Sequence, residues 1–363
     1  MGKKIFRILP VILLLVTGIL IGWFLYQKQI NSTQKNTSQT TTEINFPIID
    51  AHAHLSWNNR EETILDALTL AAQITKKNGA DFTIIVPPPF IESMPGKFDL
   101  EELKKIDDED FGFGAGGGSL NIMIQNTPTD QVTDDLKEKF HTTAEQIAAS
   151  GALVFGETTA LHFSLGANHP FEETSSIHPL FLELADVAAE YNIPIDLHME
   201  AVVDDRETPE KLLSASSANS PHLLANIPAL EELLDYNKNT KIIWAHAGWD
   251  HTDERTVALM RKLLANHSNL HMSLKTGNDC LSTNFPLEEN GQLKEEWLKL
   301  LTDFADRFVI GSDQFFSTPG SQIKYRSDHW ENEIKVLELL PREVAEKIAY
   351  QNAEKIFNLN LKN

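Results

Sequence analysis

Two histidines and an aspartate near the start of the globular region stand at alternate positions. They occur in the run Ile48-Ile49-Asp50-Ala51-His52-Ala53-His54. Alternate side chains of a β-strand share a face, so His52 and His54 would point the same way from a strand end. Two imidazoles placed like this can bind one divalent metal ion. The spacing alone is equally typical of a histidine-rich surface turn, so the rest of the chain must decide.

Apolar strand-like runs alternate with amphipathic helix-like runs from Pro47 onward, which indicates βα repetition and a parallel sheet. We expect strands at 48–52, 82–86, 120–125, 152–157, 193–198, 241–246, 270–274 and 307–313. We expect helices at 61–77, 133–149, 179–191, 223–236, 254–266, 293–304 and 342–357. Eight strands with intervening helices predict an α/β fold, the (β/α)8 TIM barrel.

Two long connections, 87–119 and 158–177, follow strand ends, where barrels carry their active sites. The first ends in a glycine-rich run, 112–118. This run lacks the Lys-Ser/Thr pair of a phosphate-binding loop and comes before a strand rather than a helix. We therefore predict a flexible or tightly turning loop there.

Six polar residues close otherwise apolar strands, and they come from five different strands. These residues are His52, His54, Glu157, His198, His246 and Asp313. A single polar residue at a strand end is usually structural, but six at the substrate-facing end of one barrel favour a common site. Imidazoles and carboxylates bind Zn²⁺, Mn²⁺ or Fe²⁺, and the ion lowers the pKa of a bound water from about 15.7 toward about 7.

Asp313 and His246 are the candidate catalytic residues of this group. A carboxylate beside a cation is well placed as a general base, so Asp313 could both bind the metal and accept the proton of its water. His246 could bind a second ion or polarise a carbonyl or phosphoryl oxygen of the substrate.

The composition narrows the possible partners. The chain has 31 Lys and Arg against 52 Asp and Glu, a formal net charge of −21, which argues against nucleic acid as a partner. The single cysteine, Cys280, excludes an internal disulfide and a cysteine-rich zinc cluster, so histidines and carboxylates must hold any metal.

The N-terminus reads as a membrane anchor. Residues 8–26 form an uncharged apolar run, long enough to span a bilayer, after Lys3, Lys4 and Arg7. We predict a signal-anchor with residues 1–29 as cytoplasmic stub and transmembrane helix, 30–45 as polar linker, and 46–363 as a catalytic domain outside the cytoplasm. Secretion after cleavage of a signal peptide is the alternative.

Five short motifs together resemble those of the amidohydrolase superfamily, metal-dependent TIM barrels, and are most similar to its amidohydrolase-2 type. They are Asp50-Ala51-His52-Ala53-His54, Gly156-Glu157, Leu197-His198, Ala245-His246-Ala247-Gly248 and Gly311-Ser312-Asp313. A terminal helix, 348–357, is also similar, so the resemblance covers about 48–357.

The resemblance implies a metal site built from the strand ends. His52 and His54 would bind from the first strand, His198 from the fifth, His246 from the sixth and Asp313 from the eighth. Glu157 stands where some relatives have a lysine that is carbamylated, so a bridging carbamate is excluded. The resemblance allows one or two bound ions, most simply Zn²⁺. Two are favoured because all six ligands are present.

The leading functional hypothesis is a membrane-anchored, metal-dependent hydrolase of a small-molecule ester, lactone, amide or phosphoester. A non-oxidative decarboxylase or isomerase with the same ligands is the alternative, and a non-catalytic, degenerate barrel is disfavoured because every ligand position is filled. Lys275, Arg206, His162 and Trp249 follow strand ends and are the candidate substrate-binding residues, with Lys275 as an anchor for an anionic group. The oligomeric state is not predicted.

Overall fold

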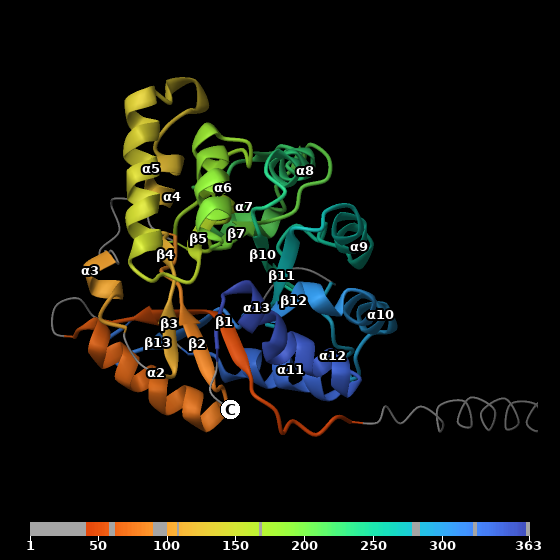
Figure 1. The fold of residues 1–363 in the computed structure, drawn as a ribbon. Helices are drawn as coiled ribbons and strands as arrows, with labels where there is room; N and C mark the ends of the chain where they lie inside the picture. Colours follow the sequence, from red (N-terminus) through yellow and green to blue (C-terminus); the bar gives the residue numbers. More distant parts are fainter. Residues whose placement is uncertain are drawn as a thin grey trace, which may run out of the picture. The chain divides into compact units, whose positions relative to one another are not determined.

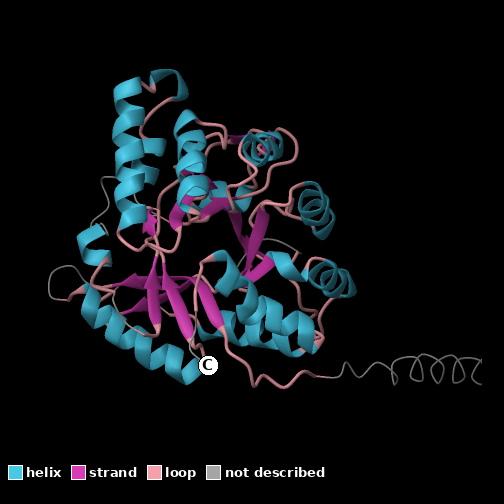
Figure 2. Cartoon of the chain, in the orientation of Figure 1, coloured by secondary structure: helices cyan, strands magenta, loops and turns pink. Residues whose placement is uncertain are grey.

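The barrel is seen in a computed structural model that describes residues 41–57, 62–89, 100–106, 109–166, 169–277, 284–321 and 325–360. Residues 42–363 form one compact unit. Its centre is a curled sheet of parallel strands, and helices pack around the outside (Figures 1 and 2). This α/β barrel is consistent with the predicted (β/α)8 architecture.

The strands follow one another around the barrel in chain order. They are β1 (Ile49–Ser56), β2 (Phe82–Ile85), β3 (Phe111–Phe113), β4 (Ala115–Gly116), β5 (Phe155–His162), β7 (Ile195–Met199), β10 (Ile242–Ala247), β11 (Leu270–Leu274) and β12 (Phe308–Ile310). β3 pairs with β2 and β4 pairs with β5, and a single glycine, Gly114, separates them. The segment 111–116 therefore occupies one position and closes the sheet. β13 (Gln314–Ser317) pairs in parallel with the second half of β1, and β6 (Glu172–Glu173) pairs antiparallel with β5.

The helices cover the outer face of the sheet with apolar stripes. The longer ones are α2 (Ile64–Asn78), α5 (Asp134–Ala149), α6 (Pro179–Tyr191), α8 (Ile227–Tyr236), α9 (Val257–Asn266), α10 (Glu295–Asp303) and α11 (Ser327–Glu338). In α6, Leu180, Leu184 and Ala188 recur every fourth residue and are buried in the core. Thr63 caps α2, where its side chain and that of Asp66 form a capping box.

The third predicted strand is wrong. Residues 120–125 form helix α4 (Leu120–Gln125), and the third strand position belongs to the glycine-rich segment predicted as a loop. A short apolar run does not by itself distinguish a strand from a helix. The glycines are needed for close packing: a Cβ on Gly114 would lie 2.5 Å from Val154 Cγ1, and one on Gly117 would lie 2.6 Å from the Pro87 carbonyl oxygen.

The other strands and helices agree with their predicted positions to within a few residues, apart from three differences. β5 continues beyond Glu157 to His162. The predicted terminal helix is divided into α12 (Arg342–Glu346), a π-helical turn (Lys347–Gln351) and α13 (Asn352–Ile356). The short α3 (Leu100–Leu103) and α7 (Glu210–Ala215), the pair β8 (Arg206–Glu207) and β9 (His222–Leu223), and α11 were not predicted.

The predicted membrane-anchored localisation requires correction. Of the helices within the described part of residues 41–360, none combines the length and the apolar character that a membrane span requires. The apolar run 8–26 and Cys280 lie outside the described residues.

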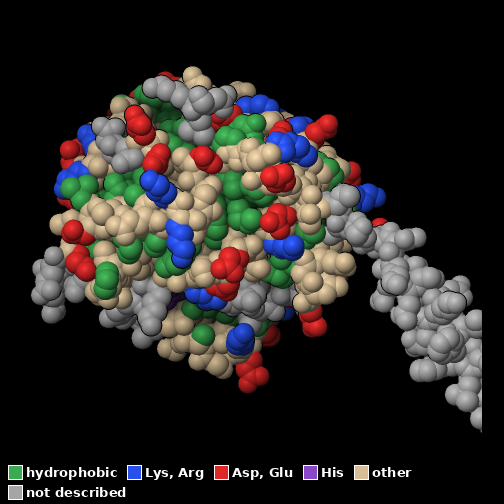
Figure 3. All heavy atoms as spheres, turned by 90° about the horizontal axis from the view of Figure 1, so that it is seen from below, with side chains coloured by type: hydrophobic (Ala, Val, Ile, Leu, Met, Phe, Trp, Pro, Cys, Tyr) green, Lys and Arg blue, Asp and Glu red, His purple; other side chains and the backbone are tan. Residues whose placement is uncertain are grey.

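Charged side chains of both signs share the surface. On the face drawn in Figure 3, Lys and Arg side chains are interspersed with Asp and Glu, and apolar side chains lie between them. Surface ion pairs such as Lys262–Glu231 and Arg261–Asp303 are partly exposed. Such pairs contribute little to the free energy of unfolding, so stability rests mainly on the apolar core.

Candidate metal centre

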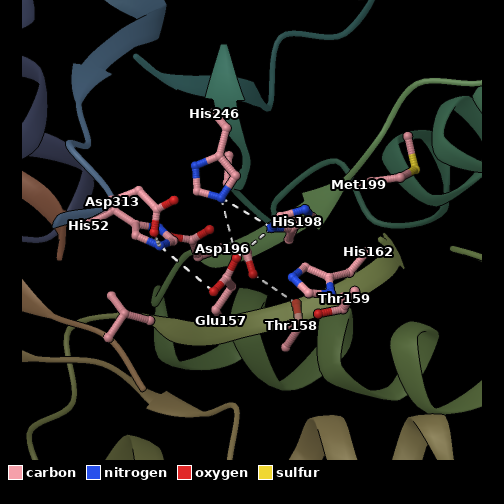
Figure 4. A network of polar contacts seen from close by, with 12 residues as sticks. His52, Glu157, Thr158, Thr159, His162, Asp196, His198, Met199, His246 and Asp313 are labelled. Atoms are coloured by element: carbon pink, nitrogen blue, oxygen red, sulfur yellow. Dashed lines mark hydrogen bonds and ion pairs between the residues drawn. The ribbon is translucent and has the colours of Figure 1, made fainter. Parts of the chain in front are cut away.

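The six predicted ligands meet in the interior at the carboxyl ends of the strands, and Figure 4 labels all of them except His54. His52 and His54 extend from β1, Glu157 from β5, His198 from β7 and His246 from β10, and Asp313 follows β12. The four histidines and Glu157 are at most 6% exposed. Burial of this many titratable groups is unfavourable unless they share protons or bind a cation.

His52 and His54 face each other through their Nε2 atoms. His52 Nδ1 lies 2.6 Å from Asp196 Oδ2, and His54 Nδ1 lies 2.7 Å from the Val86 carbonyl oxygen. Both partners accept hydrogen bonds, so each ring donates from Nδ1 and, when neutral, has a lone pair on Nε2. The two Nε2 atoms are 3.1 Å apart, a distance that requires a shared proton or a metal ion between them.

The two oxygens of Glu157 face different histidine pairs. Oε2 lies 3.9 Å from His52 Nε2 and 3.6 Å from His54 Nε2. Oε1 lies 2.7 Å from His198 Nδ1 and 3.3 Å from His246 Nε2, and these two nitrogens are 3.1 Å apart. Glu157 therefore belongs to two sets of three donor atoms.

These distances fit metal coordination. Bonds of about 2.0–2.1 Å in a tetrahedron place neighbouring donor atoms roughly 3.3 Å apart. Within the two sets, the donor atoms are separated by 2.7 to 3.9 Å. Asp313 Oδ1 adds a further donor 2.8 Å from His54 Nε2 and 3.8 Å from His52 Nε2. The cluster of His, Glu and Asp can thus hold a divalent metal ion.

Burial and neighbouring charges set the protonation of the ligands. Burial lowers the pKa of His198 to about 3 and that of His246 well below its usual range, so both rings keep a lone pair at neutral pH. Burial raises the pKa of Glu157 to about 7, against the attraction of His52 and His54. Burial would also raise the pKa of Asp313, but Lys275 and neighbouring histidines outweigh it and hold that pKa well below the usual value.

Asp196 is a functional residue that the sequence analysis missed. It is buried on β7 and accepts the Nδ1 hydrogen of His52, which fixes the ring so that Nε2 faces the cluster. It stands two positions before His198, and strand alternation could have placed both on one face. The Val86 carbonyl, which fixes His54, carries no such signal in the sequence.

Two of the ligands have left-handed backbones, with φ of 69° at His246 and 51° at Asp313. Non-glycine residues adopt this conformation rarely, and it is concentrated at functional sites. Both lie where the strand is interrupted: the pairing of β10 with β11 shifts register between Trp244 and Ala247, and Asp313 lies in the break between β12 and β13. Departure from the ladder turns these side chains inward.

Three of the four predicted substrate-binding residues lie at the centre. Lys275 Nζ pairs with Asp313 Oδ2 and lies 3.4 Å from the ring centroid of Trp249. The His162 ring lies 4.8 Å from that of His198, centroid to centroid. The Arg206 guanidinium instead pairs with Glu254 and is part-exposed.

The chain is similar to several solved structures. None of the curated proteins compared matches the sequence. Dihydroorotase from Saccharomyces cerevisiae, in complex with 5-fluoroorotic acid, is 15% identical. The match covers 87% of this chain and 85% of the dihydroorotase chain, with a TM-score of 0.52. A TatD homologue from Escherichia coli is 14% identical, the match covers 86% of this chain and 98% of the homologue, and the TM-score is 0.47. 2,6-Dihydroxybenzoate decarboxylase is 12% identical, the match covers 86% of this chain and 100% of the decarboxylase chain, and the TM-score is 0.43.

The family assignment comes from the sequence itself. The model of the amidohydrolase family matches residues 49–359, which includes all six residues of the cluster. This range is most of the chain and almost the whole barrel. The protein is therefore a member of the amidohydrolase family and an enzyme of the amidohydrolase superfamily.

Proposed function

We propose that the enzyme is a hydrolase that works with two divalent ions, most simply Zn²⁺. The observation that carries the proposal is the shared position of Glu157, whose two oxygens face two different pairs of histidines. When bound, such ions supply an activated water, because they lower its pKa from about 15.7 toward about 7. The substrate class proposed is an ester, lactone, amide or phosphoester.

Asp313 is the proposed general base. Its carboxylate is ionised at neutral pH because its pKa lies well below the usual value. Oδ1 faces His54 while Oδ2 is bound by Lys275, so the carboxylate is fixed at both ends. It is placed to take a proton from the attacking water and to pass it to the leaving group.

His162 and Trp249 are the proposed contacts for the substrate. The His162 Nδ1 atom lies 2.8 Å from the Pro170 carbonyl oxygen, so it donates there and Nε2 is left as an acceptor. Burial and neighbouring histidines keep the pKa of His162 well below its usual range, so the ring is neutral. A substrate N–H or O–H is the group that it would bind. Lys275 is occupied by Asp313, and its role as an anion anchor stays a prediction.

Removal of the first histidine pair tests the proposal. The double substitution His52→Ala and His54→Ala should lower the Zn²⁺ content from two ions per chain to at most one and abolish turnover, while the circular dichroism spectrum stays native. His222→Ala, at an exposed histidine, is the control. Zinc-loaded enzyme should be screened against esters, lactones, amides and phosphoesters, with release of CO₂ monitored in parallel. Two zinc ions retained in the double variant, or CO₂ release without hydrolysis, would contradict the proposal.

A further inference from the structure

A buried arginine holds the end of β10. Arg255 lies in the connection between β10 and α9 and is 3% exposed. Its Nη2 donates to the Trp244 carbonyl oxygen at 2.8 Å, and its Nη1 donates to the carbonyl oxygen of Ala245. The guanidinium carbon also lies 3.9 Å from the ring centroid of Trp244. The planar guanidinium therefore fixes two consecutive peptide groups.

These peptide groups immediately precede His246. His246 has a φ of 69°, and the β10–β11 ladder shifts register across it, so regular pairing does not hold its backbone. Ser273 Oγ accepts the His246 N–H at 3.3 Å, which is a long contact. The two carbonyls bound by Arg255 are thus the nearest fixed points on the N-terminal side of this ligand.

The position of Arg255 is not explained by an ordinary ion pair. Burial lowers the pKa of its guanidinium to about 9, and the carboxylates of Glu200 and Asp250 oppose that shift. Its hydrogen bonds nevertheless go to the main chain of β10. A buried charge is unfavourable, and an apolar side chain could fill the same space at lower cost.

We infer that Arg255 is a positioning residue that directs the His246 imidazole toward Glu157 and His198. The inference rests on the proposed two-ion function. It assigns a role in metal binding to a residue that does not itself bind the metal. It predicts that Arg255 affects the ion bound by His198 and His246 and leaves the ion bound by His52 and His54 almost unchanged.

Titration with Co²⁺ tests the inference on the full chain. Wild type should bind two ions with separate affinities and visible absorption bands. Arg255→Lys keeps the charge but loses the two-point fork. It should bind the second ion at least tenfold more weakly and change its absorption bands. Arg307→Lys is the matched control. Arg307 also donates to two carbonyls, those of Leu270 and His267, but at the N-terminal end of β11, whereas the six clustered residues lie at the carboxyl ends of the strands.

A double-mutant cycle with His246→Ala separates positioning from general structure. If Arg255 acts through His246, Arg255→Lys should weaken the second ion no further once the imidazole is gone. Unchanged affinities and spectrum in Arg255→Lys, equal weakening of both ions, or additive effects in the cycle would overturn the inference. Fewer than two ions in wild type would instead contradict the proposed two-ion function. The double-mutant cycle would then be carried out with the affinity for the single ion.

Discussion

Asp196 accepts the Nδ1 hydrogen of His52, and its replacement gives a quantitative prediction about metal binding. The substitution Asp196→Asn keeps the size of the side chain and an acceptor oxygen but removes the charge. The contact with His52 Nδ1 is 2.6 Å long, and both side chains are almost fully buried. A hydrogen bond to a charged group contributes about 1.5–3 kcal/mol, and about 1.4 kcal/mol is tenfold in affinity. We expect the intrinsic affinity for metal to fall roughly 10- to 100-fold, as for other groups that orient ligands.

The same substitution should change the pH dependence of binding. Burial disfavours protonated His52, but Asp196 reverses the effect and the pKa of the ring is raised to about 10. A proton therefore competes with metal for Nε2 until the pH rises through that value. In wild type the logarithm of the apparent affinity should rise by about one more unit per pH unit than in the variant. Without the carboxylate, burial lowers the pKa and this competition is lost.

The assay is a competition between the protein and a coloured chelator for Co²⁺ from pH 7 to pH 9. A global fit separates the intrinsic affinity from the proton linkage. Asp186→Asn, at a carboxylate that bonds Tyr236 and Asn237 on the surface, controls for the change of charge. Parallel pH profiles with equal intrinsic affinities for wild type and Asp196→Asn would refute the reasoning.

Three further predictions concern the base, the barrel and the metal. Asp313→Asn should keep the fold but lower kcat about 10²–10⁴-fold; near-normal kcat would remove Asp313 from the mechanism. Gly117→Ala, whose Cβ would meet the carbonyls of Pro87 and Pro88, should lower the free energy of unfolding by about 1–3 kcal/mol in urea, while Gly166→Ala, with open space around it, should not. A chelator should lower the unfolding temperature reversibly, since an ion at about 1,000 times its Kd adds about 4 kcal/mol; an unchanged temperature would argue against a metal-stabilised fold.

Much of the fold, and the residues that meet in the cluster, could be predicted because their signals are local. Apolar runs that end in His52, His198 or His246 predict, within a few residues, both a strand and a histidine at its carboxyl end. The third strand could not be predicted, because the glycines at 112–117 are required by side chains and carbonyls that are distant in the sequence.

The groups that fix the ligands were harder to predict than the ligands. Asp196 had a usable signal in its spacing from His198, whereas the Val86 carbonyl has none, since any residue supplies one. The pairing of Lys275 with Asp313 joins two strand ends 38 residues apart, and only the closed barrel brings them together. These contacts depend on tertiary structure and not on local pattern.

The number of metal ions per chain tests the central claim most directly. Elemental analysis of zinc-loaded protein should give two ions in wild type and at least one fewer in Glu157→Ala. Glu172→Gln is the matched control, because Glu172 is also a buried carboxylate but accepts a hydrogen bond from Asn121 and belongs to none of the candidate metal-binding groups among the described residues; it should keep two ions. A single ion in wild type that Glu157→Ala leaves unchanged would contradict the account.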